Sequence, residues 1–176
     1  RLRVRHVTEL PRGWLGKNHA LHSGAACATG ELVLFTDADV HFAPRAMRRA
    51  VRFAVERGAD HLTVVPDVTM PGWLLTAFTG TFAVFFGVFT KPWRAPDPRS
   101  AAHVGIGAFN LVRASFYRAH GGHEPLRLRP DDDVMLAKHL KRTRAAYKKR
   151  RDVLLEALSA ERIPGLAWNR PEGGFY

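Results

Sequence analysis

Residues 31–41 read Glu-Leu-Val-Leu-Phe-Thr-Asp-Ala-Asp-Val-His, a short apolar run that leads directly into two carboxylates. β-Branched and aromatic residues in a run of this length predict a buried strand. Because side chains alternate along an extended backbone, Asp37 and Asp39 would point the same way and repel each other. A hard cation such as Mg²⁺ or Mn²⁺ between them would remove the repulsion, since these ions prefer oxygen ligands. A plain surface turn is the alternative that this stretch leaves open.

The composition is that of a folded globular domain. The chain has 176 residues, of which 46% are hydrophobic and 24% charged, enough for one domain with a sizeable core. Its one cysteine excludes an internal disulfide framework and fits a reducing compartment. No apolar run follows the first basic residues, so no secretory signal is predicted. We therefore expect a cytoplasmic protein, with the inner face of the cell membrane as a second location.

The net charge of +11 would suit phosphate-rich or anionic partners. The densest basic cluster lies at residues 142–151. A nucleic-acid reader would show a recognisable module or aromatic platforms among its basic residues, and neither is present in this sequence. We interpret the cluster as a solvated helix face and expect no nucleic-acid partner.

Hydrophobic periodicity alternates between the two regular structures along the chain. It predicts strands at residues 2–9, 31–36, 61–65 and 104–112 and helices at 17–28, 44–57, 114–120 and 134–140. This strand–helix–strand order predicts an α/β fold with a largely parallel sheet. The last strand contains Gly105 and Gly107, which indicate a close approach of the backbone to a ligand or a neighbouring segment.

Residues 68–90 contain no charged side chain. The length would allow a membrane span, but Pro71, Gly72 and several threonines and glycines argue against one. Phenylalanines gather on one face of the helix that this segment would form, and small residues on the other. We favour a helix packed in the core. The alternative is a shallow interfacial helix bracketed by Trp73 and Trp93, a membrane-surface contact through residues 73–93.

Several motifs occur in an order that resembles glycosyltransferase family 2, which has the A-type glycosyltransferase fold. The resemblance covers about residues 1–141 and is closest to the bacterial branch that works at membranes on lipid-linked acceptors. The motifs are Gly13-Trp-Leu-Gly-Lys-Asn-His-Ala-Leu21, Thr36-Asp-Ala-Asp39, Gly105-Ile-Gly-Ala-Phe-Asn-Leu-Val-Arg113, Gly121-Gly-His-Glu124 and Asp132-Asp133.

The resemblance implies a metal-dependent, inverting glycosyltransferase that moves a sugar from a nucleotide-diphosphate donor to a hydroxyl acceptor, with a lipid-linked acceptor as one option. In that family an Asp-X-Asp motif binds the Mg²⁺ or Mn²⁺ that holds the donor diphosphate. On this chain Asp39 would be the direct metal ligand, and Asp37 would face the ribose or the metal. Lys17 and Asn18 would support the donor phosphates.

The family's catalytic base, taken from an acidic pair before a helix, falls on Asp133, with Asp132 beside it. A hydroxyl that attacks a sugar carbon needs a base within reach, which is consistent with this assignment. His123 would bind the acceptor or fill a turn, two readings that the sequence leaves open. Glu124, its neighbour, is assigned to substrate binding.

Two departures from the family pattern limit the prediction. The strand–helix–strand that opens the family's nucleotide-diphospho-sugar transferase (Rossmann-like) sheet does not precede Arg1, so we expect a partial catalytic domain at residues 1–141. The Gln-X-X-Arg-Trp motif of processive members is also missing, which argues against a polysaccharide synthase.

The remaining residues, 142–176, form a second predicted unit. Residues 145–176 resemble a segment of the small domain of class I/II pyridoxal-phosphate aminotransferases, a helix followed by a strand entered through Pro-Glu-Gly-Gly-Phe-Tyr. The chain would then be a chimera with a C-terminal helix–strand appendage. Other functions left open are an aminotransferase fragment and a non-catalytic membrane-surface module. A phosphatase of the haloacid dehalogenase type would need a small hydroxyl residue soon after Asp39, and Val40-His41 fits this poorly.

Overall fold

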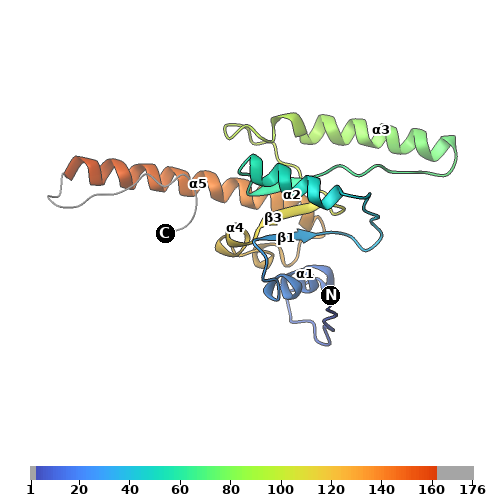
Figure 1. Ribbon diagram of the computed structural model, residues 1–176, viewed down its shortest axis with the longest axis horizontal. Helices are drawn as coiled ribbons and strands as arrows, with labels where there is room; N and C mark the ends of the chain where they lie inside the picture. Colours follow the sequence, from blue (N-terminus) through green and yellow to red (C-terminus); the bar gives the residue numbers. More distant parts are fainter. Residues whose placement is uncertain (1–2, 162–176) are drawn as a thin grey trace.

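The computed structural model describes residues 3–161 (Figure 1). The helices and strands, in chain order, are α1 (Gly16–Ala26), β1 (Leu32–Phe35), α2 (Ala46–Glu56), β2 (His61–Thr63), α3 (Trp73–Thr90), η1 (Pro92–Arg94), β3 (Asn110–Arg113), α4 (Ala114–Ala119), η2 (Glu124–Leu126) and α5 (Asp132–Glu161). Most of the helices and short strands predicted from the sequence are present, with shifted ends.

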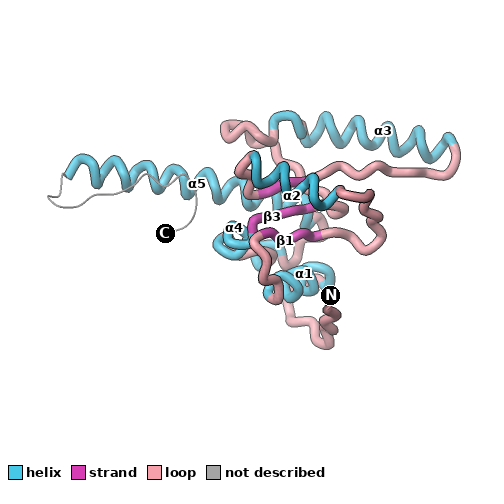
Figure 2. Tube along the Cα trace, viewed as in Figure 1, coloured by secondary structure: helices cyan, strands magenta, loops and turns pink. Residues whose placement is uncertain are grey.

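The sheet has three strands in the order β1-β3-β2, and β3 is antiparallel to both of its neighbours. Figure 2 shows the strands in magenta among the helices. β1 and β2 run parallel to each other, as the predicted strand–helix–strand requires, but they do not pair. The predicted largely parallel sheet is therefore wrong. Local periodicity identifies strands, whereas the insertion of β3 depends on where a distant segment returns.

Alternating side chains of β1 enter two apolar layers on opposite faces of the sheet. Val33 and Phe35 pack on one face with residues of α1, α4 and α5. Leu32 and Leu34 lie on the other face with Ala50 and Ala54 of α2. The sheet is thus covered on both faces, which fits the predicted α/β class.

Two predicted strands are wholly or partly missing. Residues 3–9 form no strand and their side chains are exposed. In the predicted strand 104–112 only the part from Asn110 onward joins the sheet. The preceding residues leave the sheet because Gly105 lies against the backbone of Asp133 and Gly107 against the carboxylate of Asp37.

Helix α3 does not pack in the core, so the favoured sequence interpretation is wrong. Thr90 is the helix's one buried residue, and Trp73 and Phe89 are 81% and 87% exposed. The helix stands clear of the sheet in Figure 1. Within the described residues, the segment Trp73–Arg94 is the one helix long and apolar enough to cross a membrane.

Helix α5 is a single helix of 30 residues that passes through residue 141 without a break. The predicted boundary between the two units therefore falls inside a helix, and the division into domains stays a prediction. Early in α5, Lys141 donates hydrogen bonds from Nζ to the carbonyls of Ala95, Asp97 and Ala102. These bonds attach the loop that follows α3 to α5.

Truncation of leucines in α5 and α3 should have very different effects. Leu136 is 1% exposed in the core, so Leu136→Ala should lower the free energy of unfolding by about 2–5 kcal/mol. Leu74 is 65% exposed on α3, and Leu74→Ala should change the free energy of unfolding by less than about 0.5 kcal/mol. Urea denaturation measures both. Equal losses in the two variants would contradict the exposed position of α3.

Candidate active site

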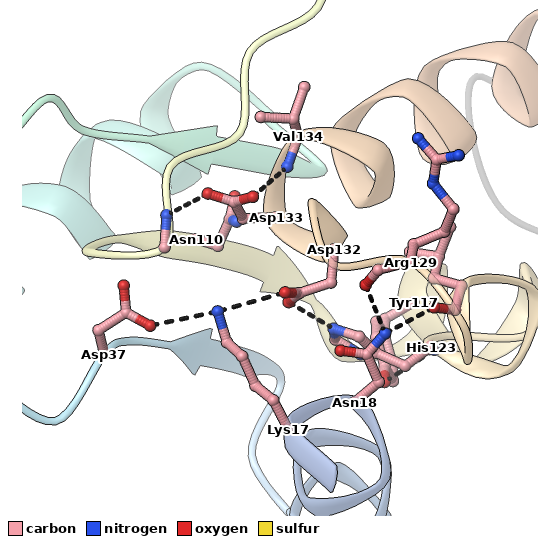
Figure 3. Close-up of polar contacts among 12 residues, drawn as sticks. Lys17, Asn18, Asp37, Asn110, Tyr117, His123, Arg129, Asp132, Asp133 and Val134 are labelled. Carbon is pink, nitrogen blue, oxygen red and sulfur yellow. Dashed lines mark hydrogen bonds and ion pairs between the residues drawn. The ribbon is translucent and has the colours of Figure 1, made fainter. Parts of the chain in front are cut away.

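Figure 3 shows Asp37 from the end of β1 and Asp132 and Asp133 from the start of α5 in one region, and hydrogen bonds to Gly107 join the two segments. The carbonyl of Gly107 accepts a hydrogen bond from the N–H of Asp37 at 3.0 Å, and its own N–H donates to Asp133 Oδ2 at 2.7 Å. Next to Asp37, Thr36 Oγ1 donates to the carbonyl of Ala108 at 2.9 Å. The two acidic motifs, far apart in the sequence, therefore share one site.

Both glycines of the 105–107 segment are required by this arrangement. A Cβ at Gly107 would overlap Asp37 Oδ2, and a Cβ at Gly105 would overlap the carbonyl oxygen of Asp133. Glycine has no Cβ and so allows this approach of backbone to neighbour. The predicted close approach is confirmed, and the neighbours are the acidic residues themselves.

Lys17 bridges the two acidic motifs. Its Nζ lies 3.4 Å from Asp37 Oδ1 and 3.2 Å from Asp132 Oδ1. Burial lowers the pKa of Lys17, but the nearby carboxylates of Asp132 and Asp37 outweigh it and raise the pKa above its usual value. Lys17 is the second residue of α1, where the helix dipole disfavours a cation, so its ammonium depends on these carboxylates.

Asn18 is buried and holds α1 in place. Its Nδ2 donates to the carbonyls of Leu126 and Arg129 at 2.6 and 2.9 Å. The N–H of Leu15 donates to the carbonyl of Arg127, which adds a third bond between the start of α1 and this segment. The sequence assigned Asn18 to the donor phosphates, whereas the structure directs its amide nitrogen to the protein backbone.

His123 is also buried, at 1% exposure, and lies between Tyr117 and Asp132. Its Nδ1 is 2.6 Å from the hydroxyl of Tyr117, whose oxygen also accepts the backbone N–H of His123 at 3.1 Å. Burial raises the pKa of Tyr117 to about 12, so its hydroxyl keeps its proton at neutral pH. Nε2 of His123 lies 3.9 Å from Asp132 Oδ2.

Burial, with smaller effects from His22 and Lys17, lowers the pKa of His123 to about 4. The ring is therefore neutral near pH 7. Gly121 and Gly122, both with positive φ, form the turn that places it, and a Cβ at Gly122 would strike the ring of Tyr117. The His123 ring is buried inside this turn, and its contact with an acceptor stays a prediction. Tyr117 carried no sequence signal of its own and was missed.

The two aspartates at the start of α5 differ in environment. Asp132 is buried, and burial raises its pKa despite the opposing effect of Lys17. Asp133 is half-buried; its Oδ2 accepts from Gly107, and its Oδ1 accepts the N–H of Val134 at 2.8 Å. Each oxygen of Asp133 keeps a lone pair for a further hydrogen bond.

Two other predicted site residues lie outside this network. Asp39 is exposed on the turn after β1 and has no hydrogen-bond or ion-pair partner among residues 3–161. Glu124 is exposed at the start of η2. The chain turns at residues 38–39, so the strand alternation that would align Asp37 with Asp39 ends before Asp39.

A divalent cation fits part of this arrangement. Within the described chain, no three His, Cys, Asp or Glu side chains come together as a complete metal site. However, Asp37 and Asp132 already share one cationic group, and within the described residues the buried Asp132 Oδ1 has no polar partner besides this ion pair with Lys17. Mg²⁺ is commonly held by one or two carboxylates together with substrate phosphates. These two carboxylates fit such a site, which donor phosphates would complete.

The model of the family described as glycosyl transferase family 2 matches residues 3–121. The chain belongs to glycosyltransferase family 2. Membership implies binding of a nucleotide-sugar donor and an acceptor in general, and it confirms the family predicted from the motifs. No curated protein and no solved structure matches the chain.

The predicted aminotransferase resemblance of residues 145–176 has no such support. Residues 145–161 continue α5 away from the glycosyltransferase family 2 domain (Figure 1). The predicted strand and the sequence Pro-Glu-Gly-Gly-Phe-Tyr that enters it lie outside the described residues.

The depressed pKa of His123 predicts a pH-dependent stability. The unfolded chain binds this proton near pH 6.5 and the folded chain only near pH 4, so protons favour unfolding between these values. Relative to His123→Gln, the wild type should lose up to about 3 kcal/mol as the pH falls from 6.5 to 4. Urea denaturation across this range measures the difference. His41→Gln, at an exposed position, should follow the wild type. Parallel curves for wild type and His123→Gln would refute the buried, neutral ring.

Proposed function

We propose that this family member transfers a sugar from a nucleotide-diphosphate donor to an acceptor hydroxyl, with inversion at the anomeric carbon. The acceptor oxygen bonds to the anomeric carbon as the bond from that carbon to the diphosphate oxygen breaks. The electron pair leaves with the diphosphate, and the acceptor proton passes to a carboxylate. A single displacement inverts the centre because the nucleophile approaches opposite the leaving group.

The observation that carries this proposal is the meeting of the β1 and α5 carboxylates across Gly107. Sugar transfer needs positive charge beside the departing diphosphate and a base beside the acceptor. Asp37 and Lys17 lie on one side of Gly107 and Asp133 on the other. The two requirements can therefore be met within one site.

Asp133 is the better placed of the two aspartates to act as the base. It is half-buried and has lone pairs free, whereas Asp132 is buried between Lys17 and His123. The bonds from Gly107 and Val134 hold the carboxylate of Asp133 in one orientation, which favours a defined approach of the acceptor. In this proposal Asp132 pairs with Lys17 while no metal is bound.

Asp37 and Asp132, with Asp39 from the neighbouring turn, are the residues that would hold Mg²⁺ or Mn²⁺. When bound, the cation supplies positive charge that neutralises the departing diphosphate. The ammonium of Lys17, which is half exposed, can turn toward the same phosphates. Glu124 and His123 stay candidates for the acceptor side of the site.

We also propose that the acceptor is lipid-linked and that α3 contacts the inner face of the cell membrane. The large apolar side chains of α3 are exposed along its length, and Trp73 and Trp93 lie near its ends. Patches of this size on soluble proteins mark interaction sites, and tryptophans concentrate at bilayer surfaces. Lys91 and Arg94 follow the apolar segment, where they would meet anionic head groups.

Nucleotide binding should require both the metal and Asp37. Calorimetric titration with a panel of nucleoside diphosphates should detect binding of one of them in Mn²⁺ and none in EDTA. Asp37→Asn should weaken that binding about tenfold or more, because it removes one charged oxygen. Asp131→Asn is the matched control, since Asp131 precedes the acidic pair but interacts with Arg129. Binding that is unchanged in Asp37→Asn would contradict the proposed donor site.

Vesicles of mixed neutral and anionic lipid should sediment the protein through α3. The double variant Phe82→Asp/Phe89→Asp changes two exposed side chains and should abolish co-sedimentation, because charge is costly in the apolar part of a bilayer. Phe53→Asp, at an exposed position of α2, should leave co-sedimentation unchanged. Circular dichroism checks that each variant is folded. Equal sedimentation of all three proteins would rule out this role of α3.

A further inference from the structure

We propose that Lys17 is the internal counter-ion of the acidic site, and that its ammonium and a divalent cation compete for the same carboxylates. This inference rests on the proposed function for the role of the metal, but not for the role of Lys17 in the metal-free protein.

Lys17 is the cation that lies between the carboxylates of Asp37 and Asp132. Across residues 3–161, the ion pairs of Asp37 and Asp132 involve Lys17 and, for Asp132, the ring of His123. Lys17 Nζ reaches both carboxylates, at 3.4 and 3.2 Å, whereas the His123 ring lies 3.9 Å from Asp132 and has no ion pair with Asp37. Among the described residues, the group that bridges the two carboxylates is therefore the ammonium of Lys17.

Lys17 is also able to leave this position. Its side chain is 51% exposed and carries the ammonium on a flexible stem, so the ammonium can move into solvent. The adjacent residue cannot move as easily, since Asn18 is buried and bonded to two backbone carbonyls. Helix α1 thus stays in place while a divalent cation replaces the ammonium of Lys17 beside the carboxylates.

Other contacts hold the backbone around Lys17. Asp37 is held by Gly107 through its backbone N–H, and Asp132 begins a helix that packs in the core through Leu136. When the ammonium withdraws, the repulsion between the two carboxylates is restored. A divalent cation that enters removes this repulsion between the carboxylates. The freed ammonium then lies beside the donor phosphates that bind together with the cation.

The first experiment measures affinity for Mn²⁺ alone. Calorimetric titration of the nucleotide-free protein should give Lys17→Met an affinity about fivefold to tenfold higher than that of the wild type, since a competing charge has been removed. Lys148→Met, which removes one charge from the far part of α5, should match the wild type, and so should Lys17→Arg, which keeps the charge. An equal or lower affinity in Lys17→Met would overturn the competition.

The second experiment needs no metal and no substrate. In EDTA, the melting temperatures of the wild type, Lys17→Met, Asp132→Asn and the double variant form a cycle. Coupling between the two residues should make the loss in the double variant smaller than the sum of the single losses. Additive losses would overturn the counter-ion role. A coupled cycle without any Mn²⁺ binding would keep the counter-ion, overturn the exchange and reject the metal-dependent part of the proposed function.

Discussion

The acidic site depends on the backbone of Gly107, which holds a residue from each side of it. Its carbonyl binds the N–H of Asp37 at the end of β1, and its N–H binds the carboxylate of Asp133 at the start of α5. These two bonds position the segment that leads into β3. The same segment thus contacts both acidic motifs and leads into the central strand of the sheet.

The charge balance of the site follows from this geometry. Three carboxylates are drawn together, one of them buried, while the nearest ring is uncharged. Burial makes unpaired negative charge costly, so such a site favours any cation that can reach it. That preference suits an enzyme whose leaving group carries negative charge. The carboxylates hold a cation in the site before the substrate binds, and the cation can then neutralise the leaving group.

Much of this arrangement could be predicted from local patterns, and the exceptions share a cause. The strand before Asp37, the helix after Lys17 and the acidic start of α5 follow from periodicity and composition within a short window. The antiparallel insertion of β3 and the exposure of α3 depend on distant packing that periodicity does not report. The burial of Asn18 and the pairing of Tyr117 with His123 likewise depend on partners that side-chain type alone does not indicate.

The three hydrogen bonds of Lys141 have a mechanical consequence for the apolar arm that α3 forms. They fasten the arm to the same helix that begins with the acidic pair, nine residues earlier in the chain. At a rise of 1.5 Å per residue, the two points are about 14 Å apart along the helix axis. A surface that binds the arm would therefore set the tilt of the carboxylates at the start of α5 and the distance an acceptor must span to reach them.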